Sequence, residues 1–182
     1  MTGWDKKRKV KKRYDLTADM YDARYAEEQE AKYYSAHVNS KSKGLVLDVG
    51  CGSGLVFDRL SSETSEVVGV DISKGLLLKA RERAKTLINV NLVQADADHL
   101  PFEDHTFCEI YMFTVLQNMP GPRATLIEAK RTARDGSMLV VTGLKRVFSI
   151  ATLKKLVRHA GLQEISIEDM ENLKCYIVLA RK

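Results

Sequence analysis

Short apolar runs alternate along most of this chain with stretches that repeat apolar residues every three or four positions. The runs of strand length cover residues 45–49, 66–70, 89–95, 107–113 and 137–142. The stretches of helical spacing cover residues 54–61, 73–84, 122–134 and 150–160. This alternation predicts a parallel sheet with helices on both faces. Ser73 and Ser149 are expected to cap helices at their start, and Gly161 to end one.

The C-terminal end of the chain has a second pattern. Two strand-like segments, LQEISIED and NLKCYIVLAR, follow one another with no helical stretch between them. Consecutive strands without a crossover helix pair antiparallel, as a hairpin. The expected fold class is therefore α/β, with a seven-stranded, mostly parallel sheet, an antiparallel C-terminal hairpin and helices on both faces.

The N-terminal end divides into two segments. Residues 6–13, KKRKVKKR, carry seven positive charges among eight positions, and residues 1–13 are expected to form a flexible basic arm. From Tyr14 onward, tyrosine and alanine recur at helical spacing and predict one or two helices. These helices, within residues 14–40, are expected to cap a single domain that spans residues 14–182, since one core suits a chain of this length.

Composition places the chain among ordinary globular proteins. Hydrophobic residues make up 45% of it, and no apolar run reaches the roughly 18 residues of a membrane-spanning helix. No secretory leader is expected. Cys51, Cys108 and Cys175 lie far apart, without the spacing of a disulfide framework or a zinc site. The resulting expectations are a reducing, cytoplasmic location, no membrane association and no bound metal.

The positive charge of the chain is concentrated in the arm. Subtracting its seven basic residues from the 29 of the whole chain leaves 22, against 24 acidic residues. The body is therefore close to neutral. Any affinity for RNA is expected to come from residues 6–13, because a cationic arm attracts phosphates by counterion release. A solubilising end and a nuclear import signal are alternative interpretations of the same residues.

The segment LVLDVGCGSG, residues 45–54, ends an apolar run with three glycines in five positions. A glycine-rich turn at the carboxyl end of a parallel strand lets the main chain approach a ligand, and the next helix offers unpaired N–H groups. The pattern predicts a nucleotide-like ligand. Leu55 stands where a dinucleotide fingerprint has its third glycine. Asp48 stands two residues before Gly50, where a phosphate-binding turn gains nothing from a negative charge.

These residues resemble the first motif of the class I S-adenosylmethionine-dependent methyltransferases, acidic-x-G-x-G-x-G. VVGVDIS resembles the second motif, QADADHLPF the third, and FCEIYMFTVLQNM the fourth strand with the loop beyond it. The resemblance extends over about residues 14–182 and implies a Rossmann-like sheet with S-adenosylmethionine as cofactor. Two positions depart from the family: Cys108 stands where an aspartate is common, and only Gly136 remains of the usual turn before the fifth strand.

The resemblance also implies roles for individual residues. Asp71 would hold both ribose hydroxyls, since a carboxylate can accept two hydrogen bonds from a vicinal diol. Asp96 and Ala97 would receive the adenine, and Asp48 would lie near the methionine amino group. Tyrosines would fold over the cofactor, where a ring near the sulfonium adds cation–π attraction. The expected cofactor-binding residues are Asp48, Val49, Gly50, Cys51, Gly52, Gly54, Asp71, Ile72, Asp96, Ala97, Phe113, Tyr21 and Tyr25.

No catalytic residue emerges from the sequence. The histidines are scattered, at positions 37, 99, 105 and 159, and none has the setting of a proton acceptor. Thr114 to Gln117 stand where an Asn-Pro-Pro-Tyr segment would mark methylation of amide or exocyclic nitrogen. Carbon methylation of cytosine needs a cysteine nucleophile, and neither Cys51 nor Cys108 follows a proline, as such a cysteine would. The interpretation is methyl transfer to an oxygen or nitrogen nucleophile.

The nature of the acceptor stays open between alternatives. The connection after the fifth strand, GLKRVFSI, is short and predicts an open mouth. Together with the arm and the cations at positions 145, 146, 154, 155 and 158, it favours RNA, either tRNA or rRNA. One alternative is a small molecule covered by the N-terminal helix. Others are a non-catalytic cofactor-binding subunit of a partner and an enzyme completed by an activator protein.

Overall fold

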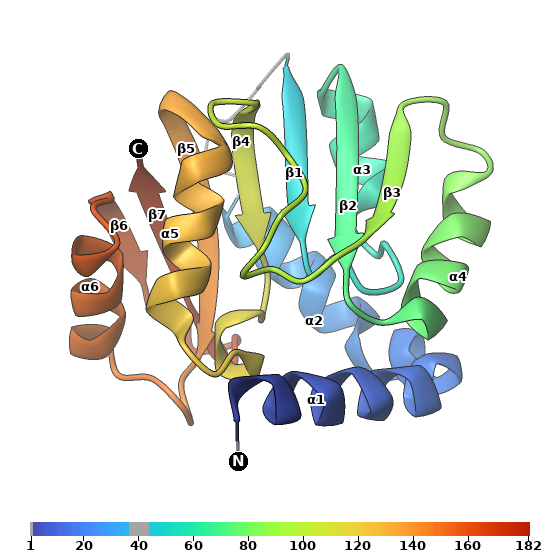
Figure 1. Ribbon diagram of the computed structural model, residues 1–182, viewed down its shortest axis with the longest axis horizontal. Coiled ribbons are helices and arrows are strands. Elements are labelled where there is room, and N and C mark those ends of the chain that lie inside the picture. The colour runs from blue at the N-terminus through green and yellow to red at the C-terminus, as the bar shows by residue number, and fades with distance from the viewer. Residues whose placement is uncertain (1, 37–43) are drawn as a thin grey trace.

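The computed structural model describes residues 2–36 and 44–182, and the question of His37 as a base lies outside them. At its centre is a seven-stranded sheet in the order β3-β2-β1-β4-β5-β7-β6 (Figure 1). Strand β7 runs antiparallel to β5 and β6, whereas the pairs among β1 to β5 are parallel. The predicted Rossmann-like fold class with its antiparallel C-terminal hairpin is confirmed. The strands are β1 (Leu45–Val49), β2 (Glu66–Asp71), β3 (Val90–Gln94), β4 (Phe107–Met112), β5 (Ala133–Leu144), β6 (Gln163–Glu168) and β7 (Cys175–Arg181).

Helices pack on both faces of the sheet because the central strands are apolar on both sides. Adjacent residues of β1 show this: Val46 belongs to the core under α2 and α3, whereas Leu47 belongs to the core under α5 and α6. Both residues are fully buried. The helices of the first face are α2 (Tyr21–Ala36), α3 (Phe57–Glu63) and α4 (Lys74–Ala84), and those of the second are α5 (Pro122–Thr132) and α6 (Ile150–His159).

Most predicted element boundaries agree with the structure to within a few residues. The hydroxyls of Ser73 and Ser149 accept hydrogen bonds from main-chain N–H groups in the first turns of α4 and α6, so both predicted caps are confirmed. Gly161 follows α6 with a φ of 74°. The prediction that the fifth strand begins at residue 137 is wrong, since β5 begins at Ala133. Gly136, with a φ of 80°, accommodates an irregularity in the pairing of β5 with β4.

The expected flexible basic arm is a helix instead. Helix α1 (Gly3–Thr17) contains all of residues 6–13, and η1 (Ala18–Met20) joins it to α2. A capping box between Thr2 and Asp5 stabilises its start. Its cations reach protein acceptors: Lys7 pairs with two aspartates, and the Lys6 ammonium donates to the Met119 carbonyl oxygen at 2.6 Å. These contacts attach α1 to the domain, which a charge run alone does not predict.

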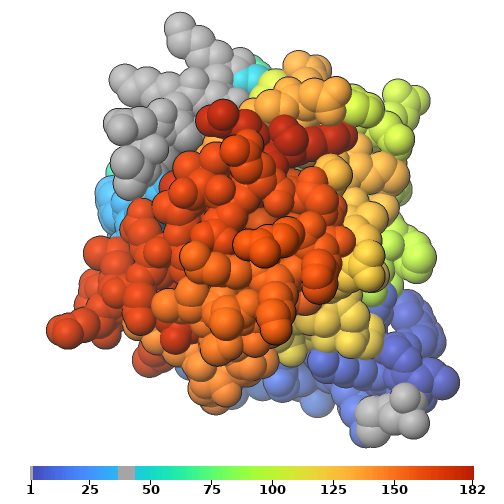
Figure 2. Space-filling view, turned by 90° about the vertical axis from the view of Figure 1, so that its left-hand side faces the viewer, coloured from blue at the N-terminus to red at the C-terminus, as the bar shows by residue number. Residues whose placement is uncertain are grey.

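Helix α1 lies across the carboxyl ends of the central strands, below their arrowheads in Figure 1. The view from the side of α6 shows the N-terminal residues, in blue, along the lower edge of the molecule (Figure 2). The end of the sheet at which ligands of this fold class bind is therefore covered by the N-terminal segment. A short helix after β4, η2 (Leu116–Asn118), contacts α1 at this end.

Candidate functional site

A cavity lies outside the carboxyl ends of the strands, at the point where the strand order of the sheet reverses. Strands β1 and β4 are neighbours, and the chain proceeds from β1 to β2 on one side and from β4 to β5 on the other. Ligands of open α/β sheets bind outside the carboxyl ends of the strands at such a point. The cavity here has a volume of about 650 Å³ and is bounded by α1, α2 and the loops that follow β1 to β5.

The loop after β1 brings bare main chain to the wall of this cavity. Gly50 lines it with a φ of 72°, and Gly52 follows with a φ of 58°. A Cβ atom on Gly50 would lie 2.7 Å from Val115 Cγ2, and one on Gly52 would lie 2.9 Å from Tyr21 Oη. Backbone conformation and close contact therefore both require glycine at these two positions.

Asp71, at the end of β2, connects two loops of the site. Its Oδ2 accepts a hydrogen bond from Gly52 N at 2.9 Å, and its Oδ1 accepts one from Ser73 N at 2.8 Å. Burial raises the pKa of this carboxyl, while the N–H groups of Ser73 and Gly52 act in the opposite direction. Each oxygen keeps a further lone pair, so Asp71 can accept two more hydrogen bonds at the cavity wall.

Asp48, near the end of β1, is a buried carboxylate with an unsatisfied oxygen. Its side chain is 2% exposed, and among the described residues Oδ2 has no hydrogen-bond partner. Burial and the neighbouring Asp71 raise its pKa to about 7. An ammonium group of a ligand would satisfy this oxygen and favour its ionised form, so Asp48 fits the amino group of S-adenosylmethionine.

The loop after β3 places Asp96 and Ala97 on another part of the cavity wall. The Lys7 ammonium contacts the Asp96 oxygens at 2.9 and 2.7 Å and Asp98 Oδ2 at 2.5 Å. Burial opposes the charge of Lys7, but its hydrogen bonds with both aspartates outweigh burial and raise its pKa. Lys7 is not recognisable as part of the site from the sequence, because its partners lie far along the chain.

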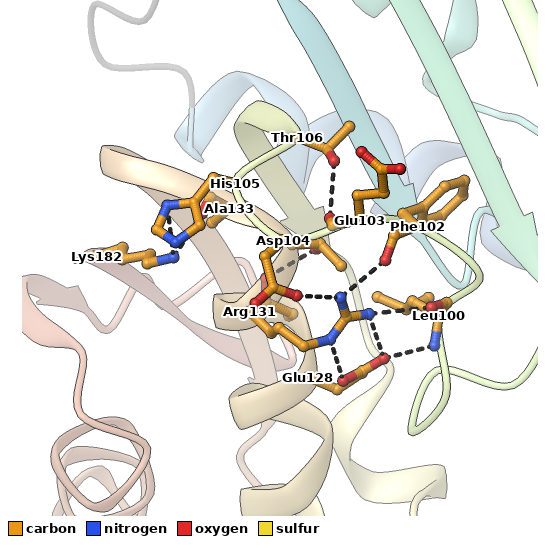
Figure 3. Close-up of polar contacts among 12 residues, drawn as sticks. Leu100, Phe102, Glu103, Asp104, His105, Thr106, Glu128, Arg131, Ala133 and Lys182 are labelled. Carbon is orange, nitrogen blue, oxygen red and sulfur yellow. Dashed lines mark hydrogen bonds and ion pairs between the residues drawn. The ribbon is translucent and has the colours of Figure 1, made fainter.

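An arginine network holds the loop that carries Asp96. The Arg131 guanidinium, from α5, donates to Glu128 and Asp104 and to the carbonyl oxygens of Phe102 and Leu100 (Figure 3). Glu128 in turn accepts a hydrogen bond from the Leu100 N–H at 2.7 Å. This network thus orders a loop that has no strand or helix of its own, and with it the part of the cavity wall formed by Asp96 and Ala97.

Three tyrosines of the N-terminal pattern form a cluster of edge-on and tilted rings over the glycine loop. The Tyr21 ring centroid lies 6.0 Å from that of Tyr14 and 4.8 Å from that of Tyr25. Burial raises the pKa of Tyr21, so its hydroxyl stays protonated. The cluster therefore presents an aromatic surface to the cavity. That these rings fold over the cofactor stays a prediction.

The structure brings together most of the predicted cofactor-binding residues. Those that line the main cavity are Gly50, Asp71, Ile72, Asp96, Ala97, Phe113, Tyr21 and Tyr25. Asp48 and Cys51 line a small second cavity that shares Gly50, Tyr21 and Phe113 with the first. The remaining three, Val49, Gly52 and Gly54, line neither of the two. Val49 is in the core, Gly52 binds Asp71 and Gly54 has a φ of 76° in the turn before α3.

Helix α2 contributes a polar wall that the sequence analysis missed. Lys32 is 2% exposed, and its ammonium lies 2.9 Å from Thr114 Oγ1 and 2.9 Å from Glu28 Oε1. Glu28, Gln29 and Lys32 follow Tyr25 at three, four and seven positions and all line the cavity. This is the spacing of one helix face. The sequence therefore predicts that these side chains share a face, but it does not predict which residues that face contacts.

Other candidate groups lie away from the cavity. His99, His105 and His159 are exposed, and none of these described histidines lines it. Within residues 2–36 and 44–182, no cluster of three or more histidine, cysteine or acidic side chains is placed to hold a metal ion. No helix of the described part combines the length and apolar character required to span a membrane.

Known sequences resemble this chain over somewhat more than half of its length. Residues 47–141 match a family model described as a methyltransferase domain. A demethylmenaquinone methyltransferase of Staphylococcus saprophyticus is 37% identical over 106 residues, which are 57% of this chain and 46% of the relative. One from Staphylococcus aureus strain MRSA252 is 36% identical over 102 residues, 54% of this chain and 42% of the relative. The matched segment thus spans less than half the length of these relatives.

Solved structures match over more of the chain, at lower identity. A SAM-dependent methyltransferase from Aquifex aeolicus has a TM-score of 0.73 at 23% identity, covering 83% of this chain and 87% of that one. The [4+2]-cyclase SpnF reaches 0.84 at 19%, covering 95% and 94%. The Haloferax volcanii complex of the Trm112 activator with a methyltransferase gives 0.79 at 16%, covering 92% and 96%. These likenesses establish the fold, which carries several functions.

Proposed function

Since this chain belongs to the class I S-adenosylmethionine-dependent methyltransferase family, we propose that it methylates a small molecule rather than RNA. Its cofactor, S-adenosylmethionine, supplies the methyl group on a sulfonium and hence as a ready electrophile. The protein then has to hold the donor, align the acceptor with it and exclude water. We propose that Asp71 holds the ribose, Asp48 the amino group and the Asp96–Ala97 wall the adenine.

The observation that carries the choice of acceptor is the cover over the site. Helices α1 and α2 bound the cavity on the side away from the sheet, so that a volume of about 650 Å³ has to take both cofactor and acceptor. Pockets of this size suit small ligands. The Staphylococcus relatives are named demethylmenaquinone methyltransferases, and their acceptor is also a small molecule. The name of the relatives supports the class of acceptor, not its identity.

The preference for RNA in the sequence analysis has no support in the structure. It depended on an open mouth and a free basic arm. Instead, α1 covers the mouth, and several of its cations are paired within the chain, including Lys7 with Asp96 and Asp98 and Lys11 with Asp15. A cation that already has a carboxylate partner contributes less to phosphate binding, since that pairing must first be broken.

The test is methyl transfer from labelled S-adenosylmethionine to a cell extract divided into RNA, protein and small-molecule fractions. We expect label in the small-molecule fraction, unaffected by ribonuclease or protease. Label that ribonuclease releases would contradict the proposal. Cofactor binding by calorimetry without any incorporation would instead favour a non-catalytic subunit, so the two failures are separable.

An activator protein and a cytoplasmic location remain predictions. The Haloferax structure has a methyltransferase of this fold bound to the Trm112 activator, which makes an activator a reasonable partner to test. If incorporation appears only when a second protein co-purifies with the chain, an activator is supported. Full incorporation by the chain alone would make it unnecessary.

A further inference from the structure

We infer that Lys32 and Glu28 form the acceptor site, and that the acceptor is a phenol or enol whose hydroxyl proton passes to Glu28 while Lys32 stabilises the anion. The inference rests on the proposed function and specifies its substrate class. The site lies between α2 and the carboxyl ends of β4 and β5, on the cavity wall opposite Asp96.

Lys32 is a buried cation at the cavity wall. Its side chain is 2% exposed and lines the cavity. An ammonium group has three N–H donors, and the contacts with Thr114 Oγ1 and Glu28 Oε1, both at 2.9 Å, use two. The structure has no third acceptor for it among the described residues. A buried cation with a spare donor at a cavity wall is a binding group for an anionic oxygen.

Glu28 adds a proton acceptor beside that cation. Its side chain is 18% exposed, lines the cavity, and contacts Lys32 through Oε1 and Lys174 Nζ through Oε2 at 3.6 Å. A carboxylate offers about four lone-pair positions, so it can accept a hydrogen bond from a ligand as well. Glu28 and Lys32 are therefore placed as the base and the cation of one site.

Two buried amide oxygens indicate that the ligand is a hydrogen-bond donor. Gln29 Oε1 and Gln117 Oε1 are buried and have no partner in the described part of the chain, and both residues line the cavity. The Gln117 amide nitrogen donates to the Thr114 carbonyl oxygen, which orients its oxygen away from that contact. Unpaired buried acceptors are costly, and a ligand that brings O–H groups satisfies them.

Thr114 holds this arrangement at the end of β4. It has a φ of 61°, a strained conformation for a β-branched residue. The strained turn is held by a hydrogen bond from Thr114 N to Thr142 Oγ1 at 2.8 Å and by one from Asn118 Nδ2 to Thr114 O at 3.2 Å. The Thr114 hydroxyl is thereby fixed where it accepts from Lys32. Strain of this kind is typical of functional sites.

The proton transfer balances without a further reactant. The O–H bond of the acceptor breaks, the proton passes to a Glu28 oxygen, and the bonding electrons stay on the acceptor oxygen. The total charge of the site is unchanged, because a carboxylate becomes neutral as a phenolate or enolate forms. Lys32 then faces the new anion. The proton leaves Glu28 for water once the products depart.

The first test uses 4-nitrophenol, whose ionised form is coloured, as a probe with the unliganded chain. At a pH below the pKa of the free phenol, the wild type is expected to bind it as the coloured anion. Lys32→Met should lose roughly 10- to 100-fold in affinity together with the colour change. Glu28→Gln should bind the anion at least as tightly, since it removes the competing carboxylate. Uncoloured binding by wild type, or equal binding by Lys32→Met, would overturn the inference.

Matched controls separate this result from misfolding and from simple charge effects. Lys155→Met, in α6, and Glu27→Gln, on the exposed side of α2, change the same residue types outside the cavity. Both should bind the probe like the wild type. Calorimetry with S-adenosylmethionine should give similar affinities for all variants, because neither Lys32 nor Glu28 is assigned to the cofactor. If Lys32→Met also loses cofactor binding, Lys32→Arg replaces it as the test. This variant keeps the positive charge and should still bind 4-nitrophenol as the coloured anion.

A pH profile tests Glu28 as the base. Once an acceptor is identified, Glu28→Gln should be slowed about 10²- to 10⁴-fold near neutral pH and should recover as the pH rises through the pKa of the free acceptor. The charged and titratable groups around Glu28 are Lys32 of α2, Lys174 and Cys175 at the start of β7, and Lys145 after β5. Burial raises the pKa of Cys175, so its thiol stays neutral. A Glu28→Gln profile parallel to wild type would overturn this role, whether or not methyl transfer itself is found.

Discussion

At the residue scale, the proposed cofactor-binding half of the site has three aspartates in different surroundings. Asp71 is satisfied by two main-chain N–H groups, Asp96 is paired with Lys7, and Asp48 has an orphaned oxygen. Under the proposed function, Asp71 suits the ribose hydroxyls of S-adenosylmethionine, Asp96 its adenine amino group and Asp48 its charged amino group. The groups around a carboxylate, and not the residue type alone, determine which ligand group it can bind.

Asp71→Asn should weaken cofactor binding by roughly 10- to 100-fold, because an amide loses one of the two charge-assisted acceptors for the ribose. Calorimetry measures this directly. Asp58→Asn, on the exposed side of α3, is the matched control and should bind normally. Unchanged affinity in Asp71→Asn would refute the assignment of this residue to the ribose.

Asp48 should make the unliganded protein less stable as the pH rises. Its pKa is near 3.8 when unfolded and about 7 when folded, so the folded state holds the proton more tightly between these values. The free energy of unfolding therefore falls from about pH 4 to about pH 7 and levels off above that. Asp48→Asn should remove part of this fall and be more stable above pH 7, by on the order of 1–4 kcal/mol. Urea unfolding across this range checks it; an equal pH dependence in both proteins would contradict it.

At the element scale, α1 is the part whose structure differs most from expectation. A helix with seven cations in residues 6–13 has little apolar surface with which to dock. Its attachment depends instead on polar contacts with the loops after β3 and β4, including Lys7 with Asp96 and Arg13 with Asn118. Because these contacts border the cavity, the stability of α1 and the affinity for the cofactor should be coupled.

Lys7→Met should release α1 from the loop after β3 that carries Asp96 and Asp98. Removing the cation of this partly buried cluster takes from Asp96 and Asp98 their charged partner, which costs on the order of 1–3 kcal/mol. We expect faster amide hydrogen exchange across residues 3–17 and weaker cofactor binding. Lys12→Met, an exposed position of the same helix, should leave both unchanged. Exchange in Lys7→Met that matches the wild type would show that α1 is held by its other contacts.

At the scale of the whole molecule, the cover over the site is what supports the proposed small-molecule acceptor. The sheet, the glycine loop and the acidic residues would serve a small-molecule enzyme and an RNA enzyme equally well. What bears on the acceptor is that α1 lies across the carboxyl ends of the central strands (Figure 1), while α2 also lines the cavity. Two helices over one cavity favour an acceptor that enters it completely.

Methyl transfer should accordingly be nearly independent of ionic strength. An acceptor bound inside the cavity has few counterions to release, so the apparent KM should change by no more than about threefold between roughly 50 and 200 mM salt. An RNA acceptor with six or more phosphate contacts would lose about 10³-fold over the same range. Steep salt dependence would therefore contradict the small-molecule assignment.

What the sequence determines by itself is what depends on neighbours in the chain. The periods of the apolar pattern predict the strands, the helices and the final hairpin, and the caps at Ser73 and Ser149 follow from local chemistry. The motif order leads to the cofactor, because each motif follows its own strand and parallel strands end at one edge. Most of the cavity wall around the cofactor could be predicted in this way.

Only the tertiary structure decides which distant charges meet. Lys7 and Asp96 are 89 positions apart, and Lys32 and Thr114 are 82 apart. A run of lysines has the same pattern whether it extends into water or pairs with carboxylates elsewhere in the fold, so the sequence predicted an arm where there is a helix. Coulomb attraction and desolvation depend on distances in space. The groups that folding brings to a site therefore decide whether a charge there is stabilised or destabilised.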